Sequence, residues 1–133
     1  MNKTNKYILI CDDCPITCLL LKTILETNGY KVETVFSGTE VLAKIETQVF
    51  DLLVLDVTMP GMDGYEVAHH IQQNRSLKCL PILLLSGHEE DEIRKKCQAR
   101  VAGIIRKPVD MNSLIEIVKK ALELNDFEQA SLV

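Results

Sequence analysis

The stretch LLVLDVTMPGMDG, residues 52–64, has the pattern of a buried β-strand that ends at an acidic loop. Residues 52–55 are an uninterrupted apolar run, which is typical of a central strand in a parallel sheet covered on both faces. Asp56 follows directly, and residues 59–64 are rich in turn-forming types. Ligands of open parallel sheets bind beyond the carboxyl ends of the strands, so Asp56 is a candidate functional residue.

Similar strand patterns alternate with amphipathic segments on both sides of this stretch. Two further apolar strands are expected at 7–11 and 80–85, and two more polar or shorter ones at 31–35 and 102–106. In the first helix we expect one apolar face, made by Ile16, Leu19, Leu20, Thr23 and Ile24. The helices are expected from Pro15 to the Asn28-Gly29 stop, at 37–46, 65–73 and 89–100, and from 110 or 112 to 124.

This alternation of strand and helix predicts an α/β fold. Strands joined by helical crossovers are parallel, and the crossovers are right-handed. The three most apolar strands belong at the centre of the sheet, which gives the order 2-1-3-4-5. That is the flavodoxin-like doubly wound (βα)5 three-layer sandwich. Residues 1–124 are expected to form one domain, and residues 125–133 a helix extension or a loose tail.

The composition narrows the class of protein. The chain has 133 residues, 47% of them hydrophobic and 26% charged, which suits one soluble domain. A net charge of -4 gives no general attraction to nucleic acid or to anionic lipid. The longest apolar runs are far shorter than a membrane span needs. We therefore expect a cytoplasmic protein whose five cysteines are free thiols.

Charged and hydroxyl side chains follow four of the predicted strands. Asp12 and Asp13 follow the first strand and Asp56 the third, on the two sides of the point where the strand order reverses. Ser86 follows the fourth strand and Lys107 the fifth. The predicted topology therefore brings three carboxylates, a hydroxyl and an ammonium group to one region.

Three adjacent carboxylates repel one another, and a divalent cation removes that repulsion. Ligands that are all oxygen select a hard cation, and Mg²⁺ is the usual choice where phosphate is handled. With the cation present, one carboxylate can act as a nucleophile toward phosphorus. Lys107 and Ser86 could then neutralise and hydrogen-bond the remaining phosphoryl oxygens.

In these features the sequence resembles the receiver domain of the two-component response regulator family. The matching residues are Asp12-Asp13, the 56–64 stretch, Ser86-Gly87 and Lys107-Pro108, in order and each at a predicted strand end. The likeness extends from about residue 6 to residue 124. It implies a signalling domain that is not an enzyme in the usual sense, although it catalyses its own phosphorylation and slow dephosphorylation.

The resemblance also implies roles for single residues. Asp56 would accept a phosphoryl group from a phosphohistidine on a sensor histidine kinase or a histidine-phosphotransfer protein. Mg²⁺ would be held by Asp13, Asp56 and the backbone carbonyl of Thr58, and by Asp12 through water. Ser86 and Lys107 would contact the phosphoryl oxygens, and the peptide bond before Pro108 would be cis.

The sequence departs from the family pattern at Ile104. Members commonly have an aromatic residue three positions before the lysine, which turns inward on phosphorylation. Ile104 could act as an aliphatic substitute, or the signal could pass through the backbone of residues 87–92. The sequence leaves both routes open.

Two other classes of function share this fold. An aspartyl phosphohydrolase usually has its nucleophile after the first strand and a second acid two residues further on, whereas Asp12 and Asp13 are adjacent. A flavin- or nucleotide-binding module needs a phosphate-binding loop after the first strand, and an acidic loop is its electrostatic opposite. Both remain alternatives to the receiver interpretation.

Several other residues have competing interpretations. Asp12 or Asp13 could cap the first helix, and Asp51 and Asp63 are expected to be structural turn residues. Cys11 is expected in the core and Cys18 on the first helix, and nearby carboxylates are expected to disfavour a Cys14 thiolate. The basic stretch on the fourth helix and fifth strand is either a solvated face or a docking surface for an output partner; it comprises Arg94, Lys95, Lys96, Arg100 and Arg106.

Overall fold

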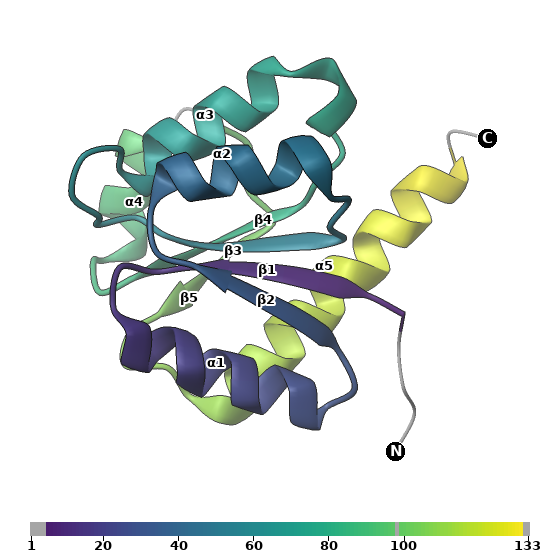
Figure 1. Ribbon diagram of the computed structural model, residues 1–133, viewed down its shortest axis with the longest axis horizontal. Coiled ribbons are helices and arrows are strands. Elements are labelled where there is room, and N and C mark those ends of the chain that lie inside the picture. The colour runs from purple at the N-terminus through teal and green to yellow at the C-terminus, as the bar shows by residue number, and fades with distance from the viewer. Residues whose placement is uncertain (1–4, 98, 132–133) are drawn as a thin grey trace.

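The central layer of the domain is a parallel sheet with the strand order β2-β1-β3-β4-β5, as predicted (Figure 1). This structure, a computed structural model, describes residues 5–97 and 99–131. The middle strands β1, β3 and β4 are buried along their whole length except at Tyr7. The strands are β1 Tyr7–Cys11, β2 Lys31–Val35, β3 Leu52–Asp56, β4 Ile82–Ser86 and β5 Gly103–Arg106.

Helices cover both faces of the sheet. Figure 1 shows α2 and α3 above the sheet and α1 and α5 below it, with α4 beside α3. The central strands alternate their side chains between two cores, so that Leu9 and Leu53 face α2 and α3 while Ile8 and Leu52 face α1 and α5. The helices are α1 Pro15–Thr27, α2 Gly38–Thr47, α3 Gly64–Gln73, α4 Glu90–Lys96 and α5 Met111–Ser131, with a short 3-10 helix at Arg75–Leu77.

The apolar face predicted for α1 is not the face that the helix buries. The helix buries Cys18, Leu21 and Leu25, whereas the side chains of Ile16 and Leu19 are 78% and 65% exposed. Both sides of this helix are apolar in sequence, so its periodicity did not identify the core side. The opposite face of α1 is therefore an exposed apolar surface.

The helix α4 is shorter than predicted and ends at Lys96. The chain beyond it is held by a side chain of α3, because the Gln72 amide binds both the N–H and the carbonyl of Arg100. The Cys97 thiol also donates to the Ala99 carbonyl, at 3.2 Å. These contacts replace the helical hydrogen bonds that the sequence pattern had indicated.

The helix α5 continues from Leu124 to Ser131, where the sequence allowed either a helix extension or a loose tail. Figure 1 shows its last turns extending past the sheet. Residues 132 and 133, the end of the predicted tail, lie outside the described residues. Within the described part of the chain, no helix is long and apolar enough to cross a bilayer.

Candidate functional site

The acidic pair Asp12-Asp13 directly follows β1, at the carboxyl edge of the sheet. Asp12 is fully buried, and Asp13 is exposed. Cys14 occupies the N-cap position of α1, so neither aspartate caps the helix. Instead, the Cys14 N–H donates to Asp12 Oδ1 at 2.9 Å, and the Asp12 N–H donates to the Val35 carbonyl of β2 at 3.3 Å. The Asp12 side chain and backbone are thus anchored to two neighbouring segments.

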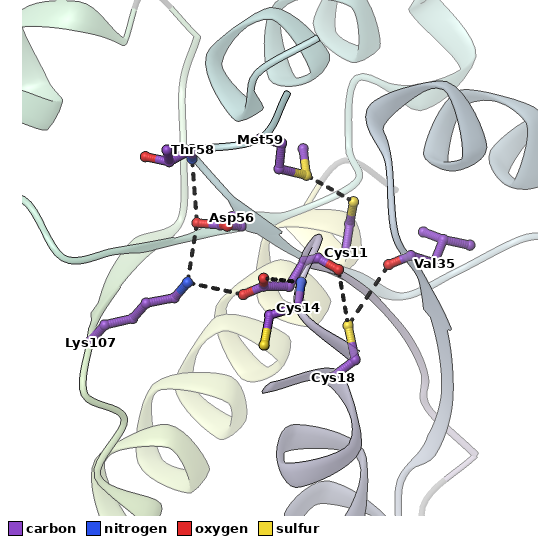
Figure 2. A network of polar contacts seen from close by, with 9 residues as sticks. Cys11, Cys14, Cys18, Val35, Asp56, Thr58, Met59 and Lys107 are labelled. Atoms are coloured by element: carbon purple, nitrogen blue, oxygen red, sulfur yellow. Dashed lines mark hydrogen bonds and ion pairs between the residues drawn. The ribbon is translucent and has the colours of Figure 1, made fainter. Parts of the chain in front are cut away.

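Asp56 is the last residue of β3 and is 3% exposed. The Thr58 N–H donates to its Oδ1 at 3.3 Å (Figure 2). The following loop returns tightly to the strand, because the Gly64 N–H donates to the Val57 carbonyl at 3.1 Å. A Cβ atom on Gly64 would lie 2.3 Å from the Asp56 carbonyl oxygen, so only glycine fits this approach.

Lys107 reaches the same pocket from the end of β5. Its Nζ lies 3.1 Å from Asp12 Oδ2 and 3.5 Å from Asp56 Oδ1, as Figure 2 shows for the lysine and Asp56. Its backbone N–H donates to the Ser86 carbonyl at 2.8 Å. The peptide bond between Lys107 and Pro108 is cis, as the resemblance implied.

Ser86 ends β4 and is 1% exposed. Its Oγ accepts a hydrogen bond from the His88 N–H at 2.9 Å. A hydroxyl that accepts this bond retains its own proton for donation to another group. A Cβ atom on the adjacent Gly87 would meet nothing within 4 Å.

The electrostatics of the pocket reflect burial and like charge. Burial raises the pKa of the Asp56 carboxyl to about 6, and the negative charge of Asp12 acts in the same direction. The Lys107 ammonium opposes this shift without cancelling it. Burial on its own lowers the pKa of Lys107, but Asp12 and Asp56 together outweigh that effect and the net shift is upward.

The three carboxylates form a group suited to a hard cation. Ligand atoms of Asp12, Asp13 and Asp56 all lie within 4.8 Å of one another. Asp12 Oδ2 is a buried side-chain oxygen that pairs with the Lys107 ammonium at 3.1 Å. This all-oxygen set of three carboxylates fits Mg²⁺ in donor type and charge.

Ile104 lies on β5, opposite Leu84 of β4. Its side chain is partly buried and packs against the core on the α2–α3 side of the sheet. An aliphatic side chain therefore occupies the position at which the resemblance implied an aromatic switch.

Two contacts of the pocket were not found from the sequence. The buried Cys18 thiol of α1 donates to the Asp12 carbonyl at 3.3 Å and lies 3.9 Å from the Val35 carbonyl, as Figure 2 shows for Cys18 and Val35. The Cys11 thiol contacts the Met59 sulfur at 3.4 Å. Cys11 and Cys18 lie in the core and on α1 as predicted, but sequence spacing carried no signal for either contact.

The cysteine thiols differ in acidity. Burial raises the pKa of Cys11 to about 12 and that of Cys18 to about 11, so both stay protonated at neutral pH. For Cys14 our prediction was wrong, because hydrogen bonds from Thr17 lower its pKa and outweigh the effect of the Asp12 charge. All five cysteines are free thiols.

Other acidic residues singled out by the sequence lie outside this group. Asp63 caps α3 by accepting the Glu66 N–H at 2.9 Å, and Asp51 accepts the Tyr7 N–H at 2.8 Å. Both have the structural roles expected for them.

The fold and the pocket define a class of protein, a doubly wound α/β domain with an acidic site where the strand order reverses. The family model described as "Response regulator receiver domain" matches residues 8–119. The chain therefore belongs to the response regulator receiver family and is a receiver domain of two-component systems.

Similar proteins include both kinases and regulators. The chain is 38% identical over 117 residues to the sensor histidine kinase GacS of Pseudomonas protegens, covering 85% of this chain and 13% of GacS. It is 42% identical over 87 residues to the alkaline phosphatase synthesis transcriptional regulatory protein PhoP of Bacillus subtilis, covering 65% of this chain and 35% of PhoP. The chain thus spans only part of either relative.

Solved structures of similar fold include response regulators. A putative response regulator from Chloroflexus aurantiacus has a TM-score of 0.85 and 30% identity, and the match covers 90% of this chain and 99% of that one. The chemotaxis response regulator CheY4 of Vibrio cholerae has a TM-score of 0.81 and 29% identity, covering 89% and 99%.

Proposed function

We propose that Asp56 of this receiver domain accepts a phosphoryl group in a Mg²⁺-dependent reaction and that the domain then signals to a partner. The observation that carries the proposal is the position of Asp56, a buried carboxylate at the end of β3 within the cluster of three aspartates. The Lys107 ammonium, 3.5 Å from Asp56 Oδ1, supplies the positive charge that an incoming phosphoryl group requires.

We assign the metal to Asp13, Asp56 and the Thr58 backbone carbonyl, with Asp12 acting through water. When bound, Mg²⁺ would offset the negative charge of the three carboxylates and of the phosphoryl oxygens. The Thr58 N–H that holds Asp56 Oδ1 keeps the Thr58 peptide beside the carboxylate. Asp12 Oδ2, which pairs with Lys107, would also accept a hydrogen bond from a metal-bound water.

The protein groups around Asp56 suit an in-line transfer. An Asp56 oxygen forms a bond to phosphorus as the bond from phosphorus to the donor imidazole nitrogen breaks, and that nitrogen keeps the electron pair. Lys107 and the Ser86 hydroxyl stabilise the phosphoryl oxygens. The same groups would support slow hydrolysis of the aspartyl phosphate. The domain would thus catalyse only the formation and the hydrolysis of its own aspartyl phosphate.

We propose that the phosphodonor is a sensor histidine kinase or a histidine-phosphotransfer protein that docks on α1. The exposed apolar surface of α1 begins directly after Asp12-Asp13, at the rim of the pocket. A donor that reaches Asp56 must cover this rim, and burial of apolar surface would favour that contact. We call this the α1 surface; it consists of Ile16, Leu19 and Leu20.

The output partner is proposed to bind the basic face of α4 and β5. Lys95 and Lys96 are exposed on α4, and Arg106 is exposed on β5, where it pairs with Glu89 at 3.4 Å. The Arg94 side chain lies outside the described residues. The free cysteines support a reducing, cytoplasmic location for these encounters.

The direct test is labelling with acetyl phosphate, a small phosphodonor that needs no docking surface. The unchanged chain is expected to gain one phosphoryl group with Mg²⁺ and none with EDTA, measured by intact-protein mass spectrometry. Asp56→Asn should abolish the gain, while Asp63→Asn, the same charge change outside the cluster, should leave it. Labelling of the Asp56→Asn variant at the wild-type level would contradict the proposal.

A further inference from the structure

Cys18 is the point at which α1 contacts the backbone of the acidic pair. Its side chain is 2% exposed and lies on the core side of α1, among residues that pack beneath the sheet. The thiol lies 3.3 Å from the Asp12 carbonyl and 3.9 Å from the Val35 carbonyl. A buried side chain thus donates a hydrogen bond to the chain segment that leads into the pocket.

We propose that Cys18 is a positioning residue for the Mg²⁺ pocket, holding the peptide unit between Asp12 and Asp13 in the orientation that metal binding needs. The inference rests on the proposed function, which places the metal at these aspartates. Cys18 touches neither the metal nor the phosphoryl group, so it would act through the backbone alone.

The geometry explains why one bond at this carbonyl affects both carboxylates. The Asp12 carbonyl belongs to the peptide group that joins Asp12 to Asp13, so restraining it limits rotation of the segment that carries both side chains. On its other side, Asp12 is held by its N–H bond to Val35 and by the bond from the Cys14 N–H to Oδ1. Cys18 therefore completes a set of restraints on a residue that lies past the end of β1.

The alternative is that Cys18 only fills space in the core. A filler would be replaced adequately by valine, which is apolar and of similar volume, whereas a donor would be replaced adequately by serine. The two roles therefore predict opposite orders for the same pair of variants. Residues that orient metal ligands through hydrogen bonds commonly change metal affinity when they are replaced.

The test measures Mg²⁺ affinity of the full chain by isothermal titration calorimetry in reducing buffer, with no phosphodonor present. Cys18→Val and Cys18→Ala are expected to weaken Mg²⁺ binding by about 3- to 10-fold. Cys18→Ser is expected to stay within about two-fold of wild type, because its hydroxyl can donate to the same carbonyl. Leu21→Ala is the matched control, since it opens a cavity one turn along the same buried face of α1.

Thermal unfolding of the same variants separates positioning from stability. Leu21→Ala is expected to lower the melting temperature and leave the Mg²⁺ affinity of the folded protein unchanged. Wild-type affinity in Cys18→Val, or a loss in Cys18→Ser equal to that in Cys18→Val, would overturn the positioning role alone. Absence of Mg²⁺ binding by the unchanged chain would overturn both this inference and the proposed function.

Discussion

The raised pKa of Asp56 makes the stability of the metal-free protein depend on pH. Its folded-state pKa of about 6 lies above the ordinary value of 3.8, so the folded state binds the proton more tightly than the unfolded state. Stability therefore falls as the pH rises through the interval between these values, and the ionised carboxylate is destabilising at pH 7. Without a bound cation or phosphoryl group, the ionised Asp56 carboxylate therefore lowers the stability of the folded protein.

This leads to a prediction for Asp56→Asn in EDTA. The variant is expected to be more stable than wild type by about 2 kcal/mol at pH 7, because the amide carries no charge to bury. The gain should be about half as large at pH 5, because that pH lies between the unfolded and folded pKa values and the folded wild-type carboxyl takes up a proton there while the unfolded one stays ionised. Urea unfolding at both pH values measures this, and an equal gain at pH 5 and pH 7 would contradict the pKa assignment.

Gly64 is the second residue whose identity the pocket dictates. A Cβ atom there would lie 2.3 Å from the Asp56 carbonyl oxygen and 2.7 Å from the Val57 Cα, and neither is a flexible side-chain atom that could move aside. Gly64→Ala is therefore expected to destabilise the protein by about 2 kcal/mol or more and to slow acetyl phosphate labelling.

Gly87→Ala is the matched control for Gly64→Ala. A Cβ atom at Gly87 meets nothing within 4 Å, so its free energy of unfolding should stay within about 0.5 kcal/mol of wild type. Denaturant titration of the two variants side by side makes the comparison. Equal stabilities would show that the loop after β3 relaxes more easily than this packing implies.

At the scale of the secondary-structure elements, the exposed face of α1 is predicted to be the docking site of the phosphodonor. Leu19→Glu places a negative charge on the α1 surface. The wild-type Leu19 side chain is 65% exposed, so the substitution is expected to leave the stability of the fold nearly unchanged. Transfer from a sensor kinase that phosphorylates the unchanged chain is expected to fall about ten-fold, while acetyl phosphate labelling stays unchanged.

Val49→Glu is the control for Leu19→Glu. Val49 is 88% exposed and precedes β3, at the end of the sheet away from the pocket. Its substitution introduces the same charge and should leave kinase transfer intact. Equal losses in both variants would point to a general charge effect rather than to docking on α1.

The central strands β1, β3 and β4 were predictable from sequence because burial on both faces leaves a plain apolar run. The face of α1 was not, since Ile16 and Leu21 are equally apolar and only the packing shows which one reaches the core. The end of α4 was missed for a similar reason, because the Gln72–Arg100 contacts join residues 28 positions apart. Local patterns carry no information about such partners.

The candidate site likewise contains residues that the sequence predicted and residues that only the packing revealed. Asp56 ends β3, and Asp12 and Lys107 directly follow β1 and β5, so the predicted strand order was enough to bring the three together. Cys18 and Gly64 support the pocket from positions with no chemical signature of their own. Sequence thus predicted the groups that carry charge, whereas the groups that hold them in place required three-dimensional packing.

For the whole molecule, the predicted domain boundary at residue 124 remains to be tested. Among the α5 side chains that the structure describes, which run to Leu124, the last buried one is Leu122, and Leu124 is 55% exposed. Ending the chain after residue 124 is therefore expected to change the free energy of unfolding by less than about 1 kcal/mol. Ending it after Lys120 removes Ala121 and Leu122, both 5% exposed, and should cost about 3 kcal/mol or more. Similar losses on both truncations would place residues 125–133 within the folded core.

The metal links the pocket to the stability of the whole fold. A cation that binds only the folded state stabilises it by about 1.4 kcal/mol at ten times its dissociation constant, which is a rise of about 5 °C in melting temperature for a domain of this size. We expect this rise with Mg²⁺ at pH 7.5. It should be smaller at pH 5, because the proton on Asp56, whose pKa is about 6, competes with the cation.

Three variants show where the cation that raises the melting temperature binds. Asp13→Asn and Asp56→Asn should lose most of the Mg²⁺-induced rise, since each removes a carboxylate from the cluster. Asp63→Asn should keep the full rise, because its side chain caps α3 instead. Thermal scans with Mg²⁺ or EDTA measure all four proteins. If Mg²⁺ stabilised Asp56→Asn as much as wild type, the cation would bind elsewhere, and the raised pKa of Asp56 would then have no part in coupling metal binding to folding.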